Sequence, residues 1–193
     1  MAAGFAVVSN VAAFKGAVDR IAGQLVYAQA VALTKTAKEL EKVSNASTEQ
    51  VFDRPVAFTK KSAAIRPALK SRLVATVFIK DIQAAYLEKE ETGGSRRPKK
   101  RYIPVPTKTR RDAHGNMPRG HVKALIHNRH AFQGTVRGVT GIWRREGRRL
   151  KLEVTYAPRA DYERRFHWRE RMRREAVARF PAQYRAQLDR LFR

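Results

Sequence analysis

A dense group of cationic side chains in the middle of the chain could bind phosphate groups. Lysine and arginine neutralise phosphates, and cations with an aromatic ring among them suit contact with a nucleic-acid backbone. Tyr102 is interleaved with these cations. Two interpretations stay open: a surface that follows a nucleic-acid backbone, and a solvated arm that binds a protein partner. The candidate interface residues are Arg96, Arg97, Lys99, Lys100, Arg101, Lys108, Arg110, Arg111 and Arg119.

The five histidines are better explained as residues of a polar surface than as ligands of a metal ion. His127 and His130 are three residues apart, and His121 lies six residues earlier. A zinc site needs three or four convergent ligands whose outer nitrogens meet carboxylates or carbonyls. Asp112 is the only carboxylate residue between positions 92 and 145. We therefore expect surface or DNA-facing histidines and no metal.

The carboxylates offer only a weak nuclease hypothesis. Asp53, Asp81, Glu88, Glu90 and Glu91 could in principle hold a divalent metal, but their spacing matches no diagnostic pattern, and a solvated acidic turn explains the last three. The sequence contains no G-x-S-x-G motif, no phosphate-binding P-loop and no cysteine. We expect no enzymatic activity and no cofactor.

The charge balance points to an anionic partner. The chain carries 41 Lys or Arg and 17 Asp or Glu residues, a net charge of +24, and residues 95–193 hold 28 of the cations against 8 acidic residues. A domain this basic repels itself unless nucleic acid, an acidic protein surface or an anionic membrane neutralises it. Arginine suits phosphate contacts and buried protein joints alike, although a GC-rich genome would also raise the arginine count.

The first half of the chain predicts a long helix followed by a strand. Apolar residues from Phe14 to Leu40 recur every three or four positions, which predicts a helix over 11–43. Residues 44–50 either end this helix or begin a second one. Residues 4–8 and 72–80 favour strands, and a helical turn is expected from Thr59 to Ala64 and another from Asp81 to Tyr86. Pro55 marks a break. No signal peptide or membrane span is expected.

The second half predicts an arm, a hairpin and a helix. Residues 88–120 are rich in glycine, proline and cations, which predicts an irregular exposed arm that ends in a turn. The segment 121–127 favours either a helix or a strand. Residues 138–145 and 149–157 form a hairpin-like pair, with Leu150 to Tyr156 alternating apolar and polar residues. A helical stripe runs from Tyr162 to Leu191, and Pro181 predicts a kink or two helices.

Together these elements predict an α+β fold. A small antiparallel sheet packs against the long N-terminal helix, with a C-terminal helix and an extended basic arm. One domain over residues 1–193 is expected, with the arm at 88–120.

The order of several short motifs resembles a known family, the tail-completion proteins of tailed bacteriophages, also described as minor tail protein Z-like. Each motif alone is weak, but they occur in order over most of the chain. They are Ala30–Ala37, Val51–Pro55, Phe58-Thr59, Ala75–Asp81, Tyr86-Leu87, Glu91, Gly93-Gly94, Asp112–Gly120, Gly141-Ile142-Trp143 and Tyr162–Phe166.

This resemblance implies a structural virion protein without catalytic residues. Such a protein is a tail or neck subunit near the head–tail connector, assembled in the host cytoplasm as an oligomeric ring around the channel through which DNA passes. Its partners are copies of itself, neighbouring tail, terminator or connector proteins, and the genomic DNA, with no membrane. The alternatives are a standalone basic nucleic-acid-binding protein and, more remotely, a metal nuclease.

Overall fold

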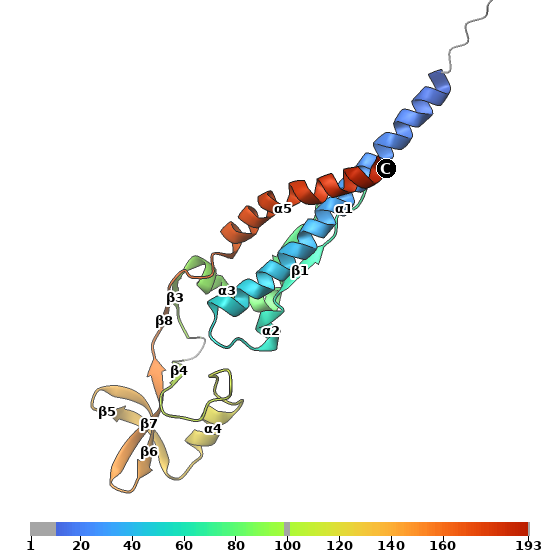
Figure 1. The fold of residues 1–193 in the computed structure, drawn as a ribbon. Helices are drawn as coiled ribbons and strands as arrows, with labels where there is room; N and C mark the ends of the chain where they lie inside the picture. Colours follow the sequence, from blue (N-terminus) through green and yellow to red (C-terminus); the bar gives the residue numbers. More distant parts are fainter. Residues whose placement is uncertain (1–10, 99–100, 193) are drawn as a thin grey trace, which may run out of the picture. The chain divides into compact units, whose positions relative to one another are not determined.

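The computed structural model describes residues 11–98 and 101–192, with side chains from residue 14 onward. The fold is α+β, as the sequence predicts, with a long N-terminal helix, a C-terminal helix and small antiparallel sheets (Figure 1). The helices are α1 (Val11–Val51), α2 (Ala57–Lys60), α3 (Asp81–Thr92), α4 (His121–Ile126) and α5 (Trp168–Leu191). The strands are β1 (Ala63–Arg66), β2 (Thr76–Ile79), β3 (Gly94–Arg96), β4 (Ile103–Pro106), β5 (Ala131–Val136), β6 (Val139–Glu146), β7 (Arg149–Ala157) and β8 (Ala160–Tyr162). None of the described helices could cross a membrane.

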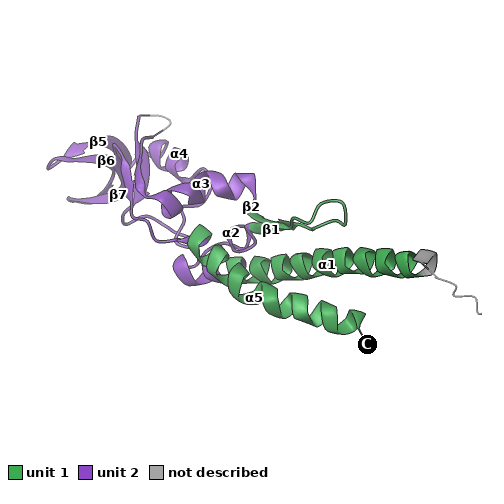
Figure 2. Cartoon of the chain, turned by 90° about the horizontal axis from the view of Figure 1, so that it is seen from above, with its two compact units in different colours: residues 1–44, 63–79, 169–193 green, residues 45–62, 80–168 purple. Residues whose placement is uncertain are grey.

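The chain divides into two compact units that interleave along the sequence (Figure 2). Unit 1 comprises residues 1–44, 63–79 and 169–193, and unit 2 comprises residues 45–62 and 80–168. One domain over residues 1–193 stays a prediction, because two units that share helix α1 can belong to one domain. The strand predicted at residues 4–8 lies outside the described residues.

Helix α1 is longer than the sequence predicts, since residues 44–50 continue it to Val51. This stretch contains Ser44, Ser47 and Thr48, which are buried although their residue types commonly end helices. Small hydroxyl side chains can stay in a helix, as when the Thr36 hydroxyl donates to the Ala32 carbonyl at 2.9 Å. The end comes at the predicted break, four residues before Pro55.

In unit 1, α5 and the β1–β2 hairpin are both bonded to α1. The Gln183 amide donates to the Glu39 carboxylate at 2.6 Å, and Arg179 pairs with the same carboxylate at 3.7 Å. The Ala68 backbone N–H donates to the Thr34 hydroxyl at 3.1 Å. The buried apolar residues are mostly alanine, and in the described part of unit 1 they are Ala28, Ala30, Ala32, Ala37, Leu40, Ala63, Ala68 and Met172.

The helical turn predicted from Thr59 to Ala64 is only half right. Helix α2 ends at Lys60, and Ala63 begins strand β1, which pairs antiparallel with β2. The β2 strand is shorter than the predicted 72–80, because residues 72–75 belong to the hairpin connection. Pairing between the two strands overrides the local helical pattern. The turn predicted from Asp81 to Tyr86 extends into the full helix α3.

The prediction that residues 88–120 are irregular is wrong for their first half. Residues 88–92 complete α3, β3 pairs with β8, and β4 pairs with β7. Local composition could not reveal this, because each partner strand lies some fifty residues or more further along the chain. The predicted turn from Asp112 to Gly120 is present as a connection without helix or strand.

Unit 2 contains a four-stranded antiparallel sheet in the order β4-β7-β6-β5. The predicted hairpin is confirmed as β6 and β7, joined at Gly147-Arg148. Strand β5, which the sequence analysis missed, pairs with β6 through a second tight turn, Arg137-Gly138. Segment 121–127 is the helix α4, and its Leu125 packs with the sheet residues Ile142 and Val154 as the core.

The C-terminal stripe is only partly helical and only partly buried. Tyr162 lies in β8, and the fully buried Phe166 precedes α5 and packs on the Phe52 ring at 5.2 Å. Helix α5 is one helix with Pro181 inside it, so the alternative of two helices is wrong. Proline removes the hydrogen bond to the Val177 carbonyl. Val177 is 71% exposed, so water can satisfy that carbonyl.

The predicted polar face of β7 is wrong at Glu153, which is only 2% exposed, whereas Leu150 is exposed. The Glu153 carboxylate lies 3.1 Å from Arg144 Nε and 3.6 Å from Lys151 Nζ. The Arg144 N–H does not point at the Glu153 oxygen, so the 3.1 Å contact is an ion pair and not a hydrogen bond. An irregularity in register between Ile142 and Trp143 interrupts the simple alternation at this point.

The β6 strand passes β7 too closely at Gly141 for any side chain. A Cβ atom built there would lie 2.1 Å from the Val154 carbonyl oxygen. We expect Gly141→Ala to lower the free energy of unfolding by about 3 kcal/mol, measured by urea denaturation. Gly134→Ala is the matched control in the same sheet, because its Cβ meets only the Phe132 ring at 3.5 Å. Equal stability of the two variants would contradict this account.

Candidate functional site

The predicted cationic residues all belong to unit 2, and those that the structure describes are exposed. Arg96 and Arg97 stand at the end of β3, and Arg101 precedes β4. Four more lie in the connection between β4 and α4: Lys108, Arg110, Arg111 and Arg119. Lys99 and Lys100 lie outside the described residues. The residues therefore fall on two connections of unit 2.

The connection after β4 is held by local hydrogen bonds. The Arg111 guanidinium donates to the carbonyls of Pro106 at 2.6 Å and Thr107 at 3.1 Å. The buried Thr109 hydroxyl lies 2.6 Å from His121 Nε2. Lys108 and Arg110 have no carboxylate partner among the described residues, so they add uncompensated positive charge to an ordered loop.

Tyr102, the aromatic residue among the predicted cations, already has a stacking partner. Its ring is parallel to that of Tyr156, with centroids 5.4 Å apart, and the Arg101 guanidinium lies 5.3 Å from its centroid. The Tyr156 hydroxyl donates to Gln133 at 2.8 Å, and burial raises the pKa of Tyr156. The aromatic ring among the predicted cations therefore helps to pack β4 on the sheet.

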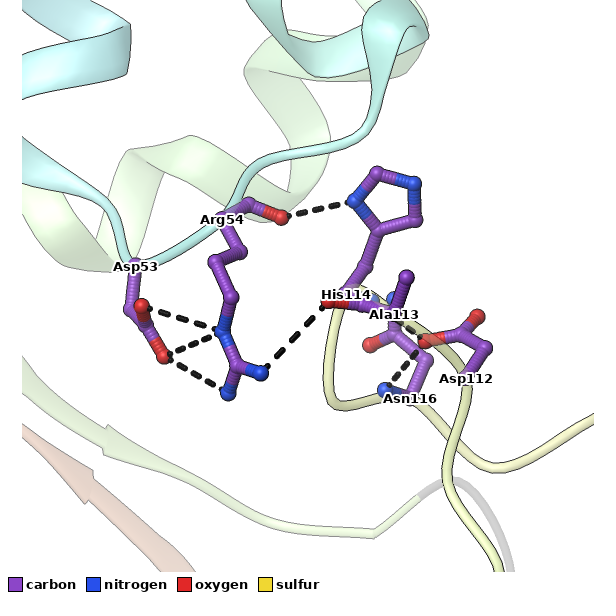
Figure 3. Close-up of polar contacts among 6 residues, drawn as sticks. All are labelled: Asp53, Arg54, Asp112, Ala113, His114 and Asn116. Atoms are coloured by element: carbon purple, nitrogen blue, oxygen red, sulfur yellow. Dashed lines mark hydrogen bonds and ion pairs between the residues drawn. The ribbon is translucent and has the colours of Figure 1, made fainter.

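Two motifs far apart in the sequence meet at a polar junction (Figure 3). Arg54 stands in the break after α1 with φ +45°, and its guanidinium contacts the Asp53 carboxylate at 3.1–3.2 Å. The same guanidinium reaches the Ala113 carbonyl at 3.5 Å, and His114 Nδ1 donates to the Arg54 carbonyl at 2.9 Å. The hydrogen bond and charge of Asp53 raise the pKa of Arg54.

Asp112 closes the turn on the other side of this junction. Its carboxylate accepts from the backbone N–H groups of His114 and Asn116, both at 2.9 Å. Its own N–H donates to the Asn116 carbonyl at 2.8 Å, and Gly115 adopts φ +80°, which favours glycine. The two hydrogen bonds of the Asp112 carboxylate fix the turn, and the charge of Asp112 also contributes to the raised pKa of Arg54.

Three of the five carboxylates of the nuclease hypothesis have other partners. Asp53 pairs with Arg54, Glu90 pairs with Arg165, and Glu91 accepts from the Trp168 backbone N–H at 2.7 Å. No group of three or more His, Asp or Glu side chains in residues 11–98 and 101–192 could hold a metal ion. The junction and its carboxylates therefore perform a structural task, which is to fix two loops of unit 2.

Several histidine rings contact groups that lie close by in the sequence or in the fold. Besides His114 and His121, His127 Nδ1 donates to the Lys123 carbonyl at 2.8 Å, and His130 Nε2 accepts from Arg129 at 3.1 Å. These contacts use one ring nitrogen of each histidine and join different neighbours. The histidines do not converge, which agrees with the surface interpretation.

Unit 2 has a pocket of about 600 Å³ beside α2 and the start of α3. Its lining is largely apolar, with the exposed side chains of Phe58 and Ile82, and Lys61, Lys80 and Asp81 border it. The Lys80 ammonium donates to the Lys61 carbonyl at 2.8 Å. The lining combines no nucleophile with a base, so the pocket offers no recognisable catalytic chemistry.

Sequence reasoning missed a second group of cations on the sheet. Arg137 lies at the β5–β6 turn, and Arg148 and Arg149 lie at the β6–β7 turn, all exposed. Residues 101–160 hold fourteen Lys or Arg and three Asp or Glu. The two Arg-Gly or Gly-Arg turns were the signal available in the sequence. Positive charge therefore covers the tight turns of the sheet as well as the predicted loop.

A scan of protein-family models, a search of curated proteins and a search of solved structures each return no match to this chain.

The role of the Asp112 carboxylate in the turn can be tested by hydrogen exchange. We expect Asp112→Ala to speed hydrogen exchange of the His114 and Asn116 amides about tenfold, because both lose their acceptor. Asp53→Ala is the control, since it removes a carboxylate from the same junction and leaves both of these bonds intact. Unchanged exchange at the two amides in Asp112→Ala would show that the carboxylate does not hold the turn.

Proposed function

We propose that this protein is a structural, non-enzymatic subunit of a tailed-bacteriophage virion. In this proposal it is a tail-completion or minor tail protein at the head–tail joint and assembles in the host cytoplasm into an oligomeric ring around the DNA channel. The observation that carries the proposal is the inverted burial of unit 1. This unit buries small residues and exposes large apolar ones, as a subunit does when its neighbours complete its core.

The exposed residues form a stripe at the start of α1. Phe14 is 73% exposed, Val18 and Ile21 are each 46% exposed, and Leu25 is half-buried. We call these four residues the N-terminal stripe. Their spacing of four, three and four residues continues to the buried Ala28 and Ala32. The stripe therefore continues the face of α1 that is buried further along the helix. Apolar residues that alternate steps of three and four positions are typical of helices that pair with each other.

The position of the stripe explains why it is uncovered. Helix α5 lies along α1, bonded to it at Glu39, and α1 runs on beyond the C-terminal end of α5 in both views (Figures 1 and 2). Burying a side chain as large as Phe14 or Ile21 is worth about 1.5–3 kcal/mol each. A neighbouring copy that covered the stripe would gain this stabilisation.

The charge of unit 2 supports a place beside DNA. Exposed cations lie on its loops and turns at Lys108, Arg110, Arg137 and Arg148. Contacts of such side chains to phosphates carry no sequence information, which suits a DNA backbone that moves. The resemblance adds support, because two of its motifs, Val51–Pro55 and Asp112–Gly120, are joined by the contacts between Arg54 and His114. Their co-occurrence in the sequence thus has a physical reason.

A stripe variant tests the oligomer. We expect the wild-type chain to self-associate and the triple variant Phe14→Gln, Val18→Gln, Ile21→Gln to associate at least about tenfold more weakly, by sedimentation equilibrium. Glutamine keeps helix propensity, so the circular dichroism should not change. The matched control Lys15→Gln, Asp19→Gln, Arg20→Gln alters exposed polar residues of the same turns. A wild-type chain that stays monomeric at high concentration contradicts the proposal.

The virion role is tested by particles assembled without this protein. Electron microscopy should then show unjoined heads and tails or defective tails, and the complemented phage should recover. Normal infectious particles in its absence would refute the role in the virion, whatever the result of the stripe variant.

The second candidate is a standalone nucleic-acid-binding protein, which the uncompensated cations of unit 2 favour. It predicts that the monomeric stripe variant still binds DNA, with affinity falling steeply between about 50 and 200 mM salt. Replacing Lys108 and Arg110 with glutamine should reduce the slope of log affinity against log salt by about one to two, measured by fluorescence anisotropy. No binding by the monomer at low salt would exclude this candidate.

A further inference from the structure

The four-stranded sheet of unit 2 has two edges, β4 and β5, that differ in their ability to accept another strand. A free edge exposes a row of backbone N–H and C=O groups that can pair with an extended segment. In an antiparallel pair, alternate residues direct these groups toward the partner strand or away from it. The positions that point away decide whether an edge is open.

The β4 edge is closed by proline. The Thr107 N–H donates to the Glu153 carbonyl, so residues 107, 105 and 103 direct their groups toward β7. The residues that point away are Pro104 and Pro106, which have no N–H to donate. The Arg111 guanidinium also donates a hydrogen bond to the Pro106 carbonyl oxygen at 2.6 Å, so this outward acceptor is already used. No outward donor remains along this strand.

The β5 edge is open at its centre. The Arg145 N–H donates to the His130 carbonyl, and the Arg137-Gly138 turn closes on the pair Val136 and Val139, so even-numbered residues of β5 face β6. The outward N–H of Ala131 donates locally to the Asn128 carbonyl. The outward groups of Gln133 and Thr135 have no backbone partner among the described residues. The six residues of β5 include no proline and no charge.

Cations stand at both ends of this open strand. Arg129 precedes β5 and Arg137 follows it, both exposed and both without a carboxylate partner in the described chain. A second β5 strand arranged antiparallel would bring Arg137 of one copy toward Arg129 and His130 of the other, which like charges oppose. A strand with acidic residues at its ends would instead meet opposite charge at both ends.

We propose that the β5 edge is a docking site for an extended segment of another protein, one with a neutral centre and acidic residues at both ends. The segment adds a strand through the outward groups of Gln133 and Thr135, and its acidic ends pair with Arg129 and Arg137. The closed β4 edge limits the sheet to one added strand. This inference concerns unit 2 alone and does not rest on the proposed virion role.

A pair of synthetic peptides tests the edge. Each has an alternating threonine and valine centre as long as β5, with glutamates at both ends in one and lysines in the other. We expect the full chain to bind the glutamate-ended peptide at least about tenfold more tightly, by fluorescence anisotropy. Nuclear magnetic resonance should show slowed amide exchange at Gln133 and Thr135. Equal binding of the two peptides, or no binding of either, overturns the proposal.

Two variants separate the backbone from the charge. Thr135→Pro removes one outward N–H and should abolish binding, whereas Thr135→Val loses the same hydroxyl contact with Thr140 but keeps the N–H and should bind. The double variant Arg129→Glu, Arg137→Glu leaves the backbone intact and should prefer the lysine-ended peptide, so the test stands even if the proline variant fails to fold. If Thr135→Pro instead changes the oligomeric state, a second copy occupies the edge and the proposed partner is wrong.

Discussion

The small residues along the buried face of α1 are the constraint on which unit 1 depends. Alanine, serine and threonine bury little apolar surface each, so the helix α5 and the β1–β2 hairpin gain limited stabilisation from packing on this face of α1. Polar contacts supplement it at Glu39 and Thr34. The large side chains that would normally fill a core, such as Phe14 and Ile21, lie outside. A neighbour that covered these side chains would stabilise unit 1, which is the physical basis of the proposed assembly.

Unit 2 keeps an excess of positive charge, with 25 Lys or Arg and 11 Asp or Glu residues. Several of its carboxylates stabilise the fold: Glu153 is buried in β7, Asp112 holds its turn and Glu90 pairs with Arg165. Backbone carbonyls, which carry no net charge, hold other cations such as Arg111. The connection after β4 thus has internal hydrogen bonds while its surface keeps positive charge.

Arg111 illustrates how one residue can serve a role that composition does not reveal. In the sequence it belongs to a cationic cluster suited to phosphate. In the structure its guanidinium lies over the carbonyls at the end of β4, beside two prolines that remove the outward donors. Arg111 therefore contributes to the closure of one sheet edge, and the proposed docking site lies on the other edge.

The sequence alone determined the α+β class, the long N-terminal helix, the β6–β7 hairpin and the excess of positive charge. Each depends on local periodicity or composition, which neighbouring residues carry. It could not determine the strands β3 and β4 within the supposed arm, the burial of Glu153 or the junction of Arg54 with His114. These features arise from partners about fifty to seventy residues apart or from a local irregularity in register, so only the tertiary structure decided them.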